Sequence, residues 1–213
     1  MMIRLVQVHT NKHWLNSTRM ATAATARMCY SHYMSTMAAE ETGTATPTPN
    51  TLFDSLEDEI DDANKRYTNI VKVVETPDCG WGVRASRTFS KHEKVMTAKA
   101  LAVTARDAHT LQKDWDKHVL VDLPSRFINH SCEANVGIKD NSLGAYDFFA
   151  LEEIKEGEDM FWDYETAEYE PLGGFQNCKC GALKCRGLMK GFKDSGNTIK
   201  KQYGSYYANY LKK

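Results

Sequence analysis

The sequence predicts a mainly β fold, built from small sheets with few short helices. Short apolar or β-branched runs recur through the middle of the chain, and turn signals such as Thr76-Pro77-Asp78 separate them. The chain has 213 residues, of which 42% are hydrophobic, and this suits one domain with an ordinary core and tails. No apolar run approaches the roughly 20 residues that span a bilayer, so we expect no membrane segment.

Residues 1–50 predict a disordered leader, because repeated Ala-Thr and Thr-Pro pairs give neither helical nor strand periodicity. The first acidic residue is Glu40, and only basic charges precede it. An acid-poor start of this kind is typical of an organelle transit peptide, here over residues 1–39. The alternatives are a plain disordered leader and a later start codon at Met20, Met28, Met34 or Met37.

Residues 51–67 form an acidic lead-in. Leu52, Phe53, Leu56 and Ile60 follow a narrow helical spacing, so we expect a short helix over residues 51–66 that docks on the domain. Acidic side chains cluster in this segment, whereas the last two dozen residues are basic. The formal net charge of the whole chain is only −1, so overall charge does not indicate a nucleic-acid partner.

The next segments predict strands with one helix among them. Apolar and β-branched residues indicate strands over residues 70–74, 83–89, 95–103, 118–121, 136–138, 146–151 and 160–164. The helix is expected over residues 104–115, because Thr104 can cap it and Ala108, Leu111 and Trp115 lie on one face. Many short strands with little helix favour the mainly β class.

The six cysteines indicate a metal site in a reducing compartment. Cys178, Cys180 and Cys185 lie within eight positions, whereas secreted disulfide frameworks spread their cysteines more evenly. Closely spaced cysteines can wrap a zinc ion, and a tetrahedral structural site needs a fourth ligand from elsewhere. Disulfides are the alternative. Of the other cysteines, Cys79 is expected to be structural and Cys29 falls in the leader.

Three more motifs carry chemistry. The polar run Arg126-Phe127-Ile128-Asn129-His130-Ser131-Cys132 is expected to turn, because Asn, His and Ser compete with the backbone for hydrogen bonds. Gly80-Trp81-Gly82 precedes this run, and Met160-Phe161-Trp162-Asp163-Tyr164 follows it. Together with the cysteine segment, these motifs in this order resemble the SET-domain protein lysine methyltransferases that carry a post-SET zinc motif. The resemblance covers roughly residues 68–190.

This resemblance implies a SET-domain, β-clip-like fold of small sheets with a knotted C-terminal loop. It implies a SET domain over residues 68–170 and a post-SET zinc segment over 171–190. The composition of residues 191–213 indicates a basic, Tyr-rich tail after them. The resemblance also implies that S-adenosyl-L-methionine is the cofactor. The matching cofactor-binding residues are Gly80, Trp81, Gly82, Arg126, Phe127, Asn129 and His130.

By the same resemblance, Tyr164 is the catalytic residue, and Cys132 completes the structural Zn²⁺ site with Cys178, Cys180 and Cys185. Catalysis would depend mostly on alignment and exclusion of water, since a methyl group moves in line to a neutral lysine amine.

Two positions depart from the family pattern. Trp162 stands where several members have the Phe or Tyr that sets how many methyl groups fit. Its larger indole narrows this pocket, so we expect mono- or dimethylation. Ala134 replaces a common Pro, and Asn135 is expected to brace the loop.

The resemblance implies a protein-lysine N-methyltransferase that acts on histone lysine in the chromatin of the nucleus. One alternative is a non-histone target in a plastid or mitochondrion, if residues 1–39 are a transit peptide. Another is a non-catalytic, SET-like zinc-binding interaction module. The basic tail with its interleaved tyrosines predicts either a weak nucleic-acid contact or a helix that packs back on the domain.

Overall fold

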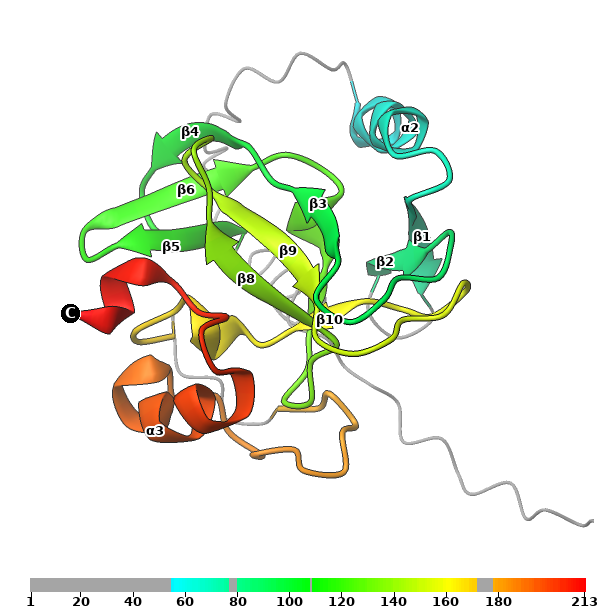
Figure 1. Cartoon of the computed structure of the whole chain (residues 1–213). Coiled ribbons are helices and arrows are strands. Elements are labelled where there is room, and N and C mark those ends of the chain that lie inside the picture. The colour runs from blue at the N-terminus through cyan, green and yellow to red at the C-terminus, as the bar shows by residue number, and fades with distance from the viewer. Residues whose placement is uncertain (1–54, 77–79, 108, 172–177) are drawn as a thin grey trace, which may run out of the picture.

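The computed structural model describes residues 55–76, 80–107, 109–171 and 178–213, and shows a mainly β domain with a helix at each end (Figure 1). Four small sheets make up the domain. Their strands are β1 (Val71–Thr76) with β2 (Gly80–Ala85); β3 (Lys94–Thr97), β9 (Tyr146–Ala150) and β8 (Val136–Asp140); β4 (Ala100–Thr104), β6 (Lys117–Val121) and β5 (Thr110–Asp114); and β7 (Asn129–His130) with β10 (Phe161–Trp162). The predicted mainly β class is confirmed.

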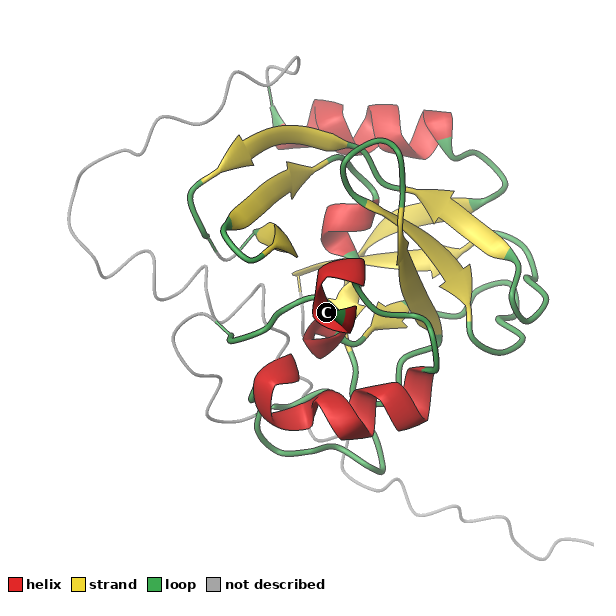
Figure 2. Ribbon diagram, turned by 60° about the vertical axis from the view of Figure 1, so that its left-hand side comes forward, coloured by secondary structure: helices red, strands yellow, loops and turns green. Residues whose placement is uncertain are grey.

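The helices of the described residues are few and short, as expected. They are the α-helices α2 (Leu56–Arg66) and α3 (Phe192–Tyr203) and the 3-10 helices η1 (Ser125–Phe127), η2 (Tyr164–Thr166) and η3 (Asn209–Lys212). Figure 2 shows that the two α-helices lie on opposite sides of the sheets. No helix in the described part of the chain has both the length and the apolar content to cross a membrane.

Helix α2 confirms the helix predicted in the acidic lead-in. Ser55 caps it by accepting a hydrogen bond from the Asp58 amide at 3.1 Å. Ile60 and Ala63 are buried on its inner face, as the spacing of the apolar residues predicted. Leu52 and Phe53 of that predicted stripe, like residues 1–50, lie outside the described residues.

The helix predicted over residues 104–115 is wrong. The chain leaves β4 at Thr104, turns, and enters β5, which pairs antiparallel with β6. Thr110 and Gln112 are buried on alternate positions, which is the period of a strand. The partner strand β6 supplies the backbone hydrogen bonds that fix this choice, and such pairing is invisible in local helical spacing. The single strand predicted over 95–103 is in fact two, because β3 pairs with β9 and β4 pairs with β6.

The hydrophobic core lies between the sheets, and it includes the C-terminal segment. Phe89, Phe148 and Ile138 are fully buried in the same cluster as Tyr203 and Tyr210. The tail therefore packs on the domain through α3 and η3 (Figure 1). Of the two roles predicted for it, this is the helix that packs back on the domain. The knotted threading of the C-terminal loop stays a prediction.

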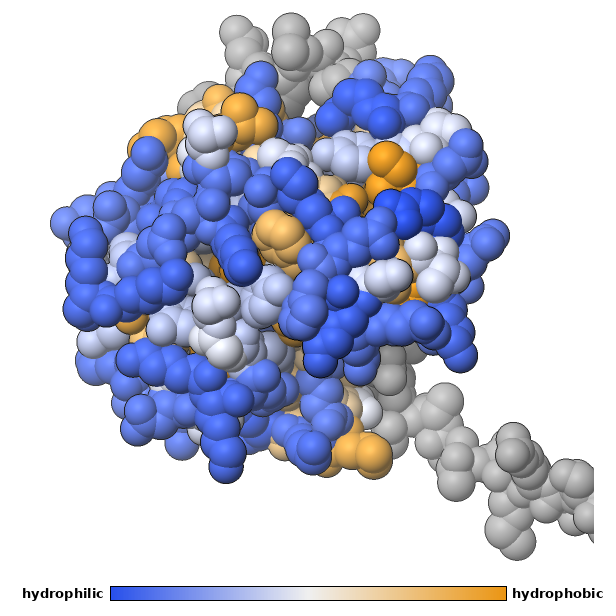
Figure 3. All heavy atoms as spheres, in the orientation of Figure 1, coloured by the Kyte–Doolittle hydropathy of each residue, from blue (hydrophilic) through white to orange (hydrophobic). Residues whose placement is uncertain are grey.

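The surface seen in Figure 3 is largely hydrophilic, with hydrophobic residues in separate patches. One patch lies over β4 at the upper left, where Leu101 and Val103 are 47% and 67% exposed. Exposed apolar side chains are common on protein surfaces.

Candidate functional site

The two polar motifs meet because β7 and β10 pair in parallel. Asn129 lies opposite Phe161, and His130 lies opposite Trp162. The amide of Ser131 donates to the carbonyl of Trp162 at 3.1 Å, which extends this pairing by one residue. As a result, a loop at the centre of the sequence and a strand some thirty residues later present their side chains in one place.

The Gly-Trp-Gly motif joins the same place through Asn129. The Asn129 side-chain amide donates to the carbonyl of Trp81 at 2.9 Å. Gly80 adopts a positive φ of 65°, which residues other than glycine rarely adopt. Gly82 is needed for space, because a Cβ there would lie 2.9 Å from the Thr76 side chain and 3.5 Å from the Asn129 amide nitrogen. Glycine is therefore required at position 80 by the backbone conformation and at position 82 by the neighbouring side chains.

A cavity of about 60 Å³ lies where these motifs converge. Its wall contains six of the residues predicted for the site: Trp81, Arg126, Phe127, Asn129, Trp162 and Tyr164. Gly80, Gly82 and His130 do not line it. The rest of the wall was not predicted from the sequence. It comes from the start of β5 with the residues before it, and from the chain after Tyr164: Arg106, Asp107, His109, Thr110, Leu111, Glu168, Pro171 and Met189. The helix wrongly predicted over residues 104–115 hid most of these.

Tyr164 and Trp162 are anchored on one backbone atom. The Tyr164 hydroxyl donates to the carbonyl oxygen of Ile128 at 3.2 Å, and the indole nitrogen of Trp162 donates to the same oxygen at 3.1 Å. The two rings lie 4.9 Å apart, and the edge of Phe148 packs on Trp162. Trp162 is 2% exposed, so its indole is a fixed wall and not a mobile side chain.

Glu168 places a carboxyl group on the cavity wall. It accepts a hydrogen bond from the amide of Gln112 at 2.8 Å, and its other oxygen lies 3.4 Å from the guanidinium of Arg106. Burial raises the pKa of Glu168 to about 7, against the partial opposing effect of these two contacts. This carboxyl group therefore changes its charge near neutral pH.

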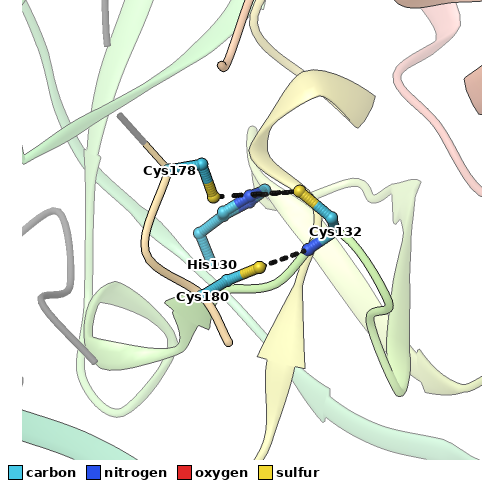
Figure 4. Close-up of side chains that lie close together, drawn as sticks. All are labelled: His130, Cys132, Cys178 and Cys180. Carbon is cyan, nitrogen blue, oxygen red and sulfur yellow. Dashed lines mark hydrogen bonds between the residues drawn. The ribbon is translucent and has the colours of Figure 1, made fainter. Parts of the chain in front are cut away.

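His130 does not line the cavity, and its ring lies among three cysteines (Figure 4). The ligating atoms of His130, Cys132, Cys178 and Cys180 all lie within 4.8 Å of one another. The sulfurs of Cys132 and Cys178 are 3.8 Å apart, which is about the edge of a tetrahedron with zinc–sulfur bonds near 2.3 Å. The donor set and spacing thus fit the zinc ion that the cysteine pattern predicted.

His130 has a contact on each of its two ring nitrogens. Its Nδ1 accepts from the amide of Tyr164 at 3.3 Å, and burial lowers the pKa of His130, which favours the neutral ring. The proton of the neutral ring then sits on Nε2, which lies 3.4 Å from the Cys132 sulfur. Cys185, the remaining predicted ligand, is not one of these four residues, and its sulfur donates to the Cys178 carbonyl at 3.4 Å.

Asn135 braces the loop after the cysteine. Its side-chain amide donates to the carbonyl of Asp159 at 2.9 Å, and its side-chain oxygen accepts from the amide of Phe161 at 2.8 Å. The expected bracing role is confirmed. Ala134, where the family often has Pro, keeps an amide that lies 3.4 Å from the Tyr203 hydroxyl of α3.

A buried ion network ties the cysteine segment to η2, the 3-10 helix that begins at Tyr164. Arg186 donates to both oxygens of Asp163 at 2.7 and 2.8 Å, and it lies 2.9 Å from Glu165. Both carboxylate side chains are fully buried. Burial acts to lower the pKa of Arg186, but the bonds and charges of the two carboxylates raise it above its ordinary value. Sequence reasoning passed over Arg186, although it directly follows Cys185.

This is a mainly β domain with a small aromatic cavity at the junction of three motifs and a cysteine cluster behind it. Residues 80–165 match the family model of the SET domain. Residues 80–165 are therefore similar to a SET domain, and the cysteine cluster is consistent with a post-SET zinc motif.

The relatives share part of their length with this chain. Histone-lysine N-methyltransferase ash1 of Drosophila melanogaster is 30% identical over 136 residues, covering 54% of this chain and 6% of ash1. Histone-lysine N-methyltransferase ASHR3 of Arabidopsis thaliana is 26% identical over 161 residues, covering 63% of this chain and 31% of ASHR3. Among solved structures, KRYPTONITE in complex with mCHG DNA and SAH matches with a TM-score of 0.44 and 23% identity, over 59% of this chain and 30% of KRYPTONITE. The chain spans less than a third of each of these proteins.

Proposed function

We propose that the protein is an S-adenosylmethionine-dependent protein-lysine N-methyltransferase. The observation that carries this proposal is the cavity, in which Trp81, Asn129 and Tyr164 from three separate motifs form one wall. Hydrophobic and aromatic walls with a few placed polar groups are typical of ligand-binding sites. When bound, S-adenosylmethionine would supply the methyl group, held by Trp81, Arg126, Phe127 and Asn129.

The chain's own residues would act mainly by orientation. The Tyr164 hydroxyl and the Ile128 carbonyl lie 3.2 Å apart and could position the target amine and the methyl group. The apolar parts of the cavity would favour the neutral amine of the target lysine, because burial disfavours an ammonium ion. These features argue against a non-catalytic module, which would have no need of them.

Replacing Tyr164 with phenylalanine tests this function. We expect the turnover number to fall by about 10²–10³, because one oriented hydroxyl is lost from the reacting centre. The assay follows labelled methyl transfer from S-adenosylmethionine to core histones, nucleosomes and a whole-cell extract. Tyr67→Phe is the matched control, since its hydroxyl donates to the Thr97 carbonyl away from the cavity. Equal rates for the wild type and Tyr164→Phe would contradict the assignment.

Trp162 leads us to propose mono- or dimethylation. Its indole is held between Phe148 and Tyr164 and bonded to Ile128, so it cannot swing aside to admit a third methyl group. We expect Trp162→Phe to shift the product toward higher methylation, measured by mass spectrometry of the product lysine. Trimethyl-lysine as the main early product of the wild type would refute this.

The proposed substrate is a histone lysine and the proposed compartment is the nucleus. The support is that ash1, ASHR3 and other relatives are named histone-lysine N-methyltransferases. A non-histone target, in an organelle if residues 1–39 direct the chain there, is the alternative. In the assay above, label on extract proteins with none on histones would favour it.

We further propose a weak nucleic-acid contact through the C-terminal segment. Residues 178–213 contain nine basic residues and one acidic residue, whereas the chain as a whole is nearly neutral. Lys190, Lys200 and Lys201 are exposed on or beside α3. The tyrosines of this segment mostly pack inward, so the contact would be electrostatic and not based on stacking. Binding of duplex DNA that weakens steeply with salt, and is lost on replacing these three lysines with glutamate, is the expected result.

A further inference from the structure

Helix α2 precedes the residues that match the SET domain, yet it supports the cavity wall. Its buried face forms a small cluster with Val73 and Leu123, and the rings of Trp81 and Phe127 pack against that cluster. These two rings stack with their centroids 6.3 Å apart, and both line the cavity. The stacked wall therefore rests partly on a helix that family membership alone would leave out.

One ion pair connects this helix to the cavity directly. The guanidinium of Arg126 lies 2.6 Å from a carboxylate oxygen of Glu59, in the middle of α2. The two side chains are 12% and 7% exposed. Arg126 also donates to the Val121 carbonyl at 3.3 Å, and its guanidinium lies 5.7 Å from the centre of the Phe127 ring. These contacts hold one conformation of a side chain that is otherwise long and flexible.

The pair also sets the charge of the wall. A lone guanidinium beside the cavity would repel the positively charged sulfonium of S-adenosylmethionine, and the carboxylate of Glu59 offsets that charge. A buried charge without its partner is costly, so removing Glu59 would also favour a different position for Arg126. Both effects act on cofactor binding and neither acts on the reacting hydroxyl of Tyr164.

We propose that α2 is part of the cofactor site and that Glu59 is a positioning residue, which holds Arg126 on the cavity wall. This inference rests on the proposed function only in that the ligand is S-adenosylmethionine or its product. It gives the acidic lead-in a role in the chemistry beyond docking.

The test measures binding of S-adenosylmethionine and S-adenosylhomocysteine to the full chain by calorimetry. Glu59→Gln should weaken S-adenosylmethionine binding about tenfold, and Glu59→Asp, which keeps the charge, should weaken it less. Because S-adenosylhomocysteine has no sulfonium charge, Glu59→Gln should weaken its binding less than that of S-adenosylmethionine. In the double variant Glu59→Gln/Arg126→Gln, the loss should equal that of Arg126→Gln alone. In turnover assays, Glu59→Gln should raise KM for the cofactor and leave kcat at saturation unchanged.

Asp62→Asn is the matched control, because Asp62 is an α2 carboxylate whose ion pair with Arg66 is about 40% exposed, and neither residue lines the cavity. It should bind like the wild type. Thermal unfolding of every variant checks that binding is compared between folded proteins. If Glu59→Gln does not fold, Glu59→Asp is used to measure the effect on binding. A wild type that binds neither ligand overturns the proposed function as well. This inference alone is overturned if the wild type binds and Glu59→Gln binds with the same affinity. It is also overturned if the losses of binding free energy from the two single variants add in the double variant.

Discussion

Replacing Arg186 with methionine is expected to lower the free energy of unfolding by about 3–5 kcal/mol, because it leaves two buried carboxylates without their cation. Asp163 and Glu165 flank Tyr164 in the chain, and neither side chain reaches solvent. The Tyr203 hydroxyl lies 3.0 Å from Asp163, but a neutral hydroxyl cannot replace a bidentate guanidinium. The 3-10 helix η2, which begins at Tyr164, would lose its link to the cysteine segment.

Urea denaturation of the full chain measures this loss. Arg84→Met is the matched control, since Arg84 and Asp159 form a similar pair at 2.8 Å with side chains 43% and 37% exposed. This surface pair should contribute at most about 1 kcal/mol. The loss of stability in Arg186→Lys should lie between those of Arg186→Met and Arg84→Met, because lysine keeps the positive charge but cannot make the bidentate hydrogen bonds of a guanidinium. A loss below about 1 kcal/mol for Arg186→Met would show that the network adds little to stability.

Removing the metal is expected to free residues 178–190 and to abolish methyl transfer. The cluster of Cys132, Cys178 and Cys180 joins this segment to the strand that holds Asn129 and His130. Met189 of the segment lines the cavity, so release of the segment would open that wall. Metal binding of this kind is coupled to folding of the segment that supplies the ligands.

The experiment treats the full chain with a chelator and follows zinc content, limited proteolysis and activity together. We expect one zinc ion per chain, faster cleavage after chelation, and recovery when zinc is restored. Cys178→Ser and Cys185→Ser should reproduce the loss, whereas Cys29→Ser should not. Wild-type zinc affinity in Cys185→Ser would show that another group, such as His130, completes the site. A metal-free protein with unchanged proteolysis would contradict the structural role of zinc.

The sequence predicted much of the site because its signals were local. Three motifs and a cysteine cluster in a fixed order indicated the SET domain, and Trp81, Asn129, Trp162 and Tyr164 do line one cavity. The acidic lead-in formed its helix for a local reason as well, since its cap and apolar spacing lie within a few turns.

Local signals failed where long-range contacts decide. The stretch from Thr104 to Trp115 has helical spacing, but β6 pairs with part of it and makes a hairpin. His130 directly follows Asn129 in the sequence, but only the fold shows that its ring lies beside Cys132. Glu59 gave no sign of pairing with Arg126, because 67 residues separate them in the chain.

The sequence by itself therefore determined the class of the domain, its motifs and the types of residue in the candidate site. Those depend on side-chain identity and on spacing within short segments. The tertiary structure decided which of these residues face the cavity, which face the cysteines, and which distant charges hold them. Those outcomes follow from strand pairing and from burial of charge, because the free energy of both depends on partners far away in the sequence.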